Sequence, residues 1–73
     1  MSNEKQTMQP YQQRVIEEGK ELESKIGKLM IFRESAQFSF LPVDQQDLLN
    51  MQYFAMELYC HVLALRVKSF NAP

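Results

Sequence analysis

The chain has 73 residues, a formal net charge of −1 and a single cysteine, Cys60. A chain of this length forms one domain at most and buries only about 60% of the surface that its unfolded form exposes, so a monomer is marginally stable. One cysteine excludes an internal disulfide and a four-ligand zinc site, and the acidic balance argues against a protein that binds DNA through many phosphate contacts. We therefore expect oligomerisation to supply the missing stability, with no metal and no cofactor.

Residues 1–9 are polar and aperiodic and lack the apolar core of a signal peptide. No stretch of the chain approaches the roughly 20 apolar residues of a membrane span. We expect an N-terminal tail or short helix over these residues, then one helical domain over residues 10–70, in a cytoplasmic protein without membrane contact.

A first helix is expected over about residues 10–35. Pro10 suits the first turn, where its missing N–H costs nothing. The apolar stripe alternates steps of four and three, as in packed helices, and consists of Val15, Gly19, Leu22, Ile26 and Leu29. Gly19, inside the stripe, predicts a close approach of the second helix. Gly27 lies off the stripe and is expected beside another backbone or a ligand.

Residues 36–42 are expected to form the turn. Serines interrupt the apolar pattern here, and the residue before Pro42 is steered away from helical angles. Phe38, Phe40 and Leu41 are too apolar for a free loop, so we expect them to cap the end of the hairpin.

A second helix is expected over about residues 43–70, with Asp44 and Asp47 at its positive end. Its apolar residues form two stripes. The first reads Leu48, Gln52, Ala55, Tyr59, Val62 and Arg66, and the second reads Met51, Phe54, Leu58 and Leu65. One partner helix covers only one such stripe, so the second requires another subunit. The sequence therefore predicts an all-α, antiparallel two-helix hairpin that oligomerises through its second helix.

Several polar residues of the first helix share a flank. A wheel of about 100° per residue places Lys25 beside Arg14, with Tyr11 slightly inward, whereas Gly27 lies on the opposite flank and Lys28 points outward. One interpretation is an exposed Glu21–Lys25 pair. The other is a small site for an anion, because an aromatic face and two cations can stack a base and neutralise a phosphate.

Arg66 is in line with a stripe that we expect to be buried. An unpaired guanidinium there would be costly, so we expect it to find a carboxylate, carbonyl groups or an anion at a subunit junction.

Catalytic motifs are lacking. His61 has no serine or cysteine partner arrangement, and there is no glycine-rich phosphate loop. The neighbouring carboxylates Glu17 and Glu18 diverge by about 100° on a helix and cannot flank one scissile bond. We therefore expect a protein that is not an enzyme.

The runs "YQQRVIEEGKELESKIGKLMIF" and "LPVDQQDLLNMQYFAMELYCHVLALRV" resemble short phage proteins that share the anti-CBASS and anti-Thoeris hairpin domain. The likeness covers about residues 11–70 and depends on "QRV", "KELESKIGKL", the aromatic and proline turn, "LLNMQ" and "LALRV", in that order.

This resemblance implies a hexamer of helical hairpins in the cytoplasm of an infected host. Anti-CBASS members are sponges that sequester the cyclic oligonucleotide messengers of bacterial CBASS immunity, so the effector is not activated. By motif, the dinucleotide-binding lysine is Lys25, the stacking aromatic is Tyr11, and the trinucleotide-binding arginine is Arg66. Arg14 and Lys28 complete the set of binding candidates.

The sequence departs from the family pattern at Gly27, where a threonine is frequent. This glycine removes a hydroxyl donor from the trinucleotide flank. Two alternatives stay open: a phage structural or adaptor hairpin that binds a protein partner, and a sponge for signals of the cyclic ADP-ribose type.

Overall fold

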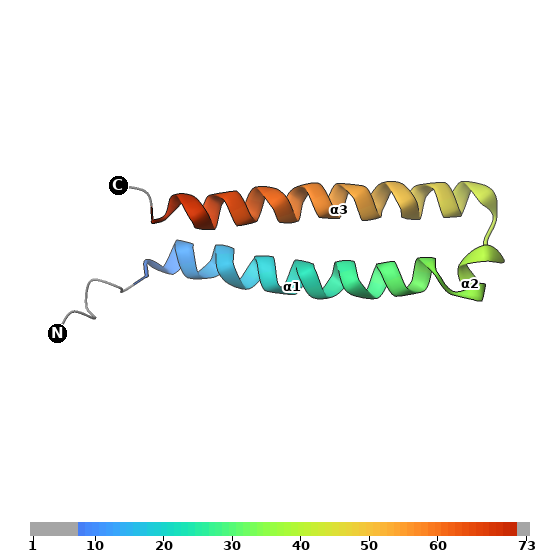
Figure 1. Ribbon diagram of the computed structural model, residues 1–73, viewed down its shortest axis with the longest axis horizontal. Coiled ribbons are helices and arrows are strands. Elements are labelled where there is room, and N and C mark those ends of the chain that lie inside the picture. Colours follow the sequence, from blue (N-terminus) through green and yellow to red (C-terminus); the bar gives the residue numbers. More distant parts are fainter. Residues whose placement is uncertain (1–7, 72–73) are drawn as a thin grey trace.

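The computed structural model describes residues 8–71 as a long helical hairpin (Figure 1). It contains helices α1 (Pro10–Arg33), α2 (Ala36–Ser39) and α3 (Val43–Ser69), and no strand within the described part. α1 and α3 lie side by side and antiparallel, with α2 in the connection between them (Figure 1). The predicted all-α class is confirmed. Most of the expected N-terminal tail, residues 1–7, lies outside the described residues.

The helix ends follow from local hydrogen bonds. At the start of α1, the Gln9 N–H donates to the side-chain carbonyl of Gln12 at 3.0 Å. Ser35 stands between α1 and α2, where its hydroxyl donates to the Phe32 carbonyl at 2.6 Å and accepts from the Phe38 N–H at 3.3 Å. A serine is a preferred N-cap, so α1 stops here and one new helical turn begins.

The connection from α2 to α3 is held by Gln46. Its side-chain amide donates to the carbonyls of Leu41 at 2.9 Å and Ser39 at 3.3 Å. These two bonds tie the end of α2 to the first turns of α3, so the closed end of the hairpin has a defined shape.

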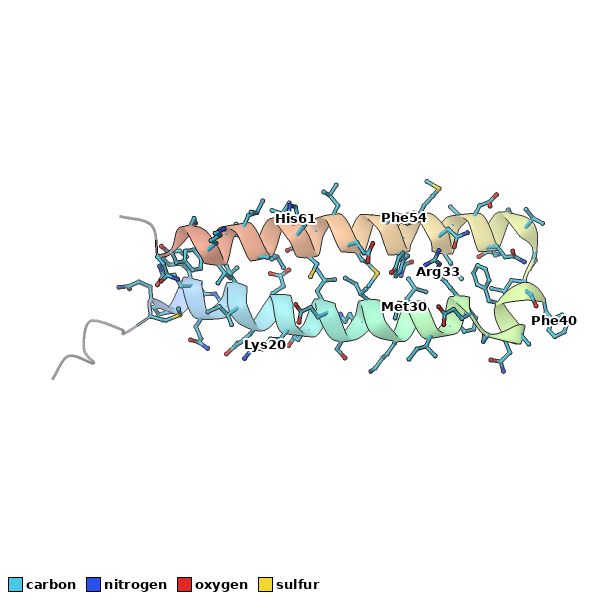
Figure 2. All side chains as sticks on the ribbon, in the orientation of Figure 1. Lys20, Met30, Arg33, Phe40, Phe54 and His61 are labelled. Carbon is cyan, nitrogen blue, oxygen red and sulfur yellow. The ribbon has the colours of Figure 1, made fainter. Side chains whose placement is uncertain are left out.

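The predicted aromatic cap is only partly correct. Phe38 packs edge-on against Phe32 with ring centroids 6.0 Å apart. Phe40 is 83% exposed and points away from the tip of the hairpin (Figure 2). The expectation for Phe40 is wrong, because Phe38 already occupies the inner side of the single turn and leaves Phe40 outside.

The core is small. Among the described residues, the buried apolar side chains are Val15 and Leu22 of α1 and Leu63 of α3, and of these Leu63 is fully buried. The half-buried residues packed against them are Ile26, Met56, Cys60, Val67 and Phe70. The α1 stripe is therefore confirmed where it meets α3. The free thiol of Cys60 is half-buried against this core.

The face that α3 turns toward α1 is not the predicted one. Met56, Cys60 and Leu63 face the core, whereas every member of both predicted stripes is exposed. Apolar residues occur on nearly all sides of α3, so periodicity alone does not choose the inner face. Arg66 is consequently exposed, so its expected buried position within the hairpin is wrong. A partner for Arg66 at a subunit junction stays a prediction.

The prediction for Gly19 is also wrong. A Cβ atom added at Gly19 would meet no atom of the described chain within 4 Å, and the same holds for Gly27. The two long helices are therefore not drawn together at Gly19, because their spacing there is set by Val15, Leu22 and Leu63. No second backbone of the described chain lies beside Gly27.

Neither of the long helices in the described part of the chain is apolar enough to cross a membrane.

Candidate ligand-binding groove

One side of the α1–α3 seam forms an open groove of about 460 Å³. Its lining mixes cations, carboxylates, one apolar side chain and one aromatic ring: Arg14, Glu17, Glu18, Glu21, Leu22, Lys25 and Tyr59. Leu22 belongs to the buried core, so the groove has an apolar floor and polar walls.

The spacing along α1 explains why these side chains meet. Residues three and four apart lie on one helix face, and Arg14, Glu21 and Lys25 keep such steps. The structure thus brings together Arg14 and Lys25, the two cations that the helix wheel placed on one flank.

A hydrogen bond links the two walls of the groove. The Tyr59 hydroxyl of α3 donates to the carboxylate of Glu18 on α1. This bond is the main reason that the pKa of Tyr59 is raised, followed by burial and by the negative charge of Glu18, while the positive charge of Arg66 acts in the opposite direction. Tyr59 therefore stays a neutral phenol across the physiological pH range.

The charges of the groove are mixed. Three of its side chains are carboxylates, Glu17, Glu18 and Glu21, whereas two are cations. Arg66 lies about two helical turns after Tyr59 on α3, and its positive charge acts on the Tyr59 phenol, although Arg66 does not line the groove. One chain does not offer a purely cationic surface, so an anion would be recognised by direct contact with Arg14 and Lys25.

The remaining predicted site residues lie elsewhere. Tyr11 packs edge-on against Phe70 at 5.8 Å at the open end of the hairpin and is 51% exposed. Gly27 is half-buried and Lys28 is exposed, and neither lines the groove. The aromatic ring that lines the same groove as Lys25 is instead Tyr59, which the sequence predicted to lie in an apolar stripe.

A second polar cluster lies at the closed end of the hairpin, where Figure 2 shows Arg33 between the two long helices. The Arg33 Nε donates to the side-chain oxygen of Asn50 at 2.8 Å. Its guanidinium carbon lies 4.1 Å from the ring centroid of Tyr53 and 5.6 Å from that of Phe54. The pKa of Tyr53 is raised, mainly by its hydrogen bond with Glu57. Sequence reasoning missed this cluster, although an arginine at the end of α1 opposite two adjacent aromatics was a usable signal.

The opposite side of the seam is more apolar. A groove of about 320 Å³ there is lined in part by Gly19, Cys60 and Ala64. No group of three or more potential metal ligands occurs within residues 8–71. Lys20 and Glu23 also line this groove, but the pair of cations Arg14 and Lys25 lies on the other side of the seam.

The sequence model of the Sequestin family matches residues 9–69 of the chain. The chain belongs to the Sequestin family. The matched range includes both long helices and every residue that lines the groove.

A relative supports the same placement. The chain is 40% identical over 64 residues to a protein of Enterobacteria phage T4, named "Uncharacterized 7.5 kDa protein in denB-rIIB intergenic region". The alignment covers 88% of this chain and 100% of that relative. No solved structure matches the chain.

Proposed function

We propose that this Sequestin-family protein is a non-catalytic sponge that binds and sequesters cyclic oligonucleotide messengers of bacterial CBASS immunity. The match to the Sequestin family over residues 9–69 carries the proposal, because the name of the family denotes sequestration. The phage relative supports a role during infection. The resemblance to anti-CBASS hairpins narrows the ligand to cyclic dinucleotides, with trinucleotides as a further class.

The groove supplies chemistry suited to such a ligand. Arg14 and Lys25 are cations for phosphate groups, and Tyr59 offers an aromatic ring for a base. Each charge-assisted hydrogen bond contributes about 1.5–3 kcal/mol, and stacking contributes about 1–3 kcal/mol per base. Two charge-assisted contacts and one stacking contact support tight binding when the groove is formed before the ligand arrives.

The sponge acts by stoichiometry and not by turnover. His61 is exposed and does not line the groove with Arg14 and Lys25, so the groove has no histidine to act as a general base. We further propose that the protein works as a homo-oligomer in the cytoplasm of the infected host and does not bind DNA. The resemblance to anti-CBASS hairpins implies that this oligomer is a hexamer. Many copies then remove the messenger before the effector is activated.

The test is recovery of bound nucleotide. The purified protein is incubated with a panel of cyclic di- and trinucleotides, free ligand is removed, and the protein is denatured by heat. Release of intact cyclic nucleotide is the expected result. Linearised or cleaved nucleotide would indicate an enzyme, and the linear dinucleotide of the same bases serves as the control for recognition of the ring.

An adaptor hairpin is the second candidate function. The observation that favours it is the row of exposed apolar side chains on α3, including Met51, Phe54 and Leu58, since such surfaces bind partners. Failure of every cyclic nucleotide to bind a correctly folded protein would favour this candidate over the sponge.

A further inference from the structure

The charged side chains on the α1 wall of the groove follow a palindromic order. A cation stands at each end, Arg14 and Lys25, and a carboxylate stands four residues inside each cation, Glu18 and Glu21. On a helical wheel of about 100° per residue, these four residues lie within about 60° of one another, and Glu17 lies about 40° outside the row. The wall therefore presents two acceptor groups between two positive charges.

The spacing of this row suits one nucleotide in each half. Arg14 and Glu21 are seven residues apart, and so are Glu18 and Lys25, which corresponds to about 10 Å along an α-helix. Phosphate and base stand at opposite ends of a nucleotide, so one cation and one carboxylate of the row reach the two ends of the same unit. The cation binds the phosphate through charge-assisted hydrogen bonds, which leaves the carboxylate for the base.

The two carboxylates of the row are not equivalent. Glu18 accepts the hydrogen bond of the Tyr59 hydroxyl and so holds that ring on the opposite wall. Glu21 is exposed, and within residues 8–71 no hydrogen bond engages its carboxylate. The acceptor that the groove offers to a base is therefore Glu21.

A carboxylate distinguishes between the bases by its chemistry. When ionised it has two oxygens side by side, and both only accept hydrogen bonds. The Watson–Crick edge of guanine carries two neighbouring donors, the ring N1–H and the exocyclic amino group. Adenine and cytosine place an acceptor nitrogen beside their amino group, and uracil has one donor between two carbonyl groups, so these edges turn an acceptor toward a negative oxygen. A carboxylate therefore favours guanine.

We propose that Glu21 binds the Watson–Crick edge of a guanine, so that the preferred ligand of the groove is a cyclic dinucleotide with at least one guanine. Arg14 and Lys25 bind the phosphates, and the second base stacks on Tyr59. Stacking on an aromatic ring tolerates every base, so one guanine is sufficient. This inference rests on the proposed function and deepens it by naming the base that the groove selects.

Isothermal titration of the full-length protein with three ligands tests the inference. The ligands are the cyclic dinucleotides of two guanosines, of one guanosine and one adenosine, and of two adenosines, with the same phosphodiester linkages. Both ligands that contain guanine are expected to bind the parent protein about 10-fold to 100-fold more tightly than the adenosine ligand, as for a bidentate contact with the correct base.

Glu21→Gln is the decisive variant, because an amide offers one donor and one acceptor and pairs well with adenine. It is expected to remove the preference for guanine. Glu23→Gln is the matched control, since it makes the same change on α1 at a residue that lines the grooves on the other side of the seam. The control is expected to keep the preference. Comparing the ratio of affinities within each protein cancels the general effect of removing one negative charge.

The outcomes separate this inference from the sponge. Equal affinity of the parent protein for the three ligands, or a guanine preference that survives in Glu21→Gln, would overturn the role of Glu21 and leave the sponge standing. Absence of binding by all three ligands would overturn it as well, and the wider panel of the recovery experiment then decides the sponge separately. Circular dichroism checks that both variants fold like the parent protein, as expected for changes at exposed positions.

Discussion

Tyr59 of α3 donates a hydrogen bond to the carboxylate of Glu18 on α1, across 41 residues of sequence. Both side chains line the groove that contains Arg14 and Lys25. The bond holds the phenol ring of Tyr59 on the α3 wall of the groove and engages one carboxylate of the α1 wall. One contact therefore joins the packing of the hairpin to the chemistry of the candidate site.

This bond predicts a loss of stability at high pH. The pKa of Tyr59 is raised above its ordinary value of 10.0, and the pKa of Tyr53 is raised for a similar reason. A raised pKa of a phenol favours the neutral form in the folded state, so the contribution is complete below pH 10.0 and is lost as the pH rises through the folded-state pKa.

Thermal unfolding between neutral and strongly alkaline pH checks this prediction. The melting temperature of the parent protein is expected to fall more steeply above the ordinary tyrosine pKa than that of Tyr59→Phe, because the variant has no proton to lose. Parallel curves for the two proteins would contradict the prediction.

Leu63 is 1% exposed and is the largest fully buried side chain in the described part of the chain. Leu63→Ala is expected to destabilise the fold by about 2–5 kcal/mol, because a buried leucine leaves a cavity when it is truncated. Ile31→Ala, at a position that is 68% exposed, is the control and is expected to change the free energy by about 0.5 kcal/mol or less. Urea unfolding followed by circular dichroism measures both. Equal midpoints for the two variants would show that Leu63 is not the centre of the core.

The sequence predicted α1 better than α3, for a physical reason. In α1 most residues around Val15 and Leu22 are charged, so one apolar stripe stands out from the other faces. In α3 apolar residues surround the axis, and the inner face is chosen by contact with α1, which places Met56 and Leu63 inside. Periodicity contains no information about that choice when a second apolar face exists.

The candidate site was half predictable. Arg14 and Lys25 share a flank through helix geometry alone, so the wheel was sufficient. Tyr59 comes from α3, and its position depends on which face of α3 packs against α1, which the sequence did not determine. The prediction of a close helix approach at Gly19 was wrong because a small residue permits such an approach but does not require it.

The contacts of Arg33 predict that replacing it by lysine lowers the stability of the fold. Its guanidinium stacks on Tyr53 and donates to Asn50, and a lysine keeps the charge but loses the planar group and the Nε donor. Arg33→Lys is expected to cost about 1 kcal/mol of stability. The same change at the exposed Arg66 is expected to cost about 0.5 kcal/mol or less. Chemical denaturation of both variants measures the two losses of unfolding free energy. An equal loss at the two positions would argue against a specific stacking contact of Arg33.

The position of Lys25 in the groove predicts that its charge contributes to the affinity for a cyclic dinucleotide. Lys25→Ala is expected to weaken binding of a cyclic dinucleotide by about 10-fold to 100-fold, through loss of one charge-assisted contact. Lys20→Ala is the matched control, because it removes the same charge from the other flank of α1, where Lys20 points away from α3 (Figure 2). Isothermal titration compares the two, and sedimentation confirms unchanged assembly. Equal affinity for the parent protein and Lys25→Ala would remove Lys25 from the site.

The two glycines of α1 give the last prediction. A Cβ at Gly19 or Gly27 meets open space in the hairpin, and alanine is favoured over glycine in a helix by about 1 kcal/mol. Gly19→Ala and Gly27→Ala are therefore each expected to raise the melting temperature of the ligand-free protein. Ser24→Ala, on the same helix, calibrates the smaller gain from helix propensity alone. A fall in melting temperature at either glycine would mean that an atom from outside the chain occupies that space, and sedimentation of the same variant would identify a second copy as its source.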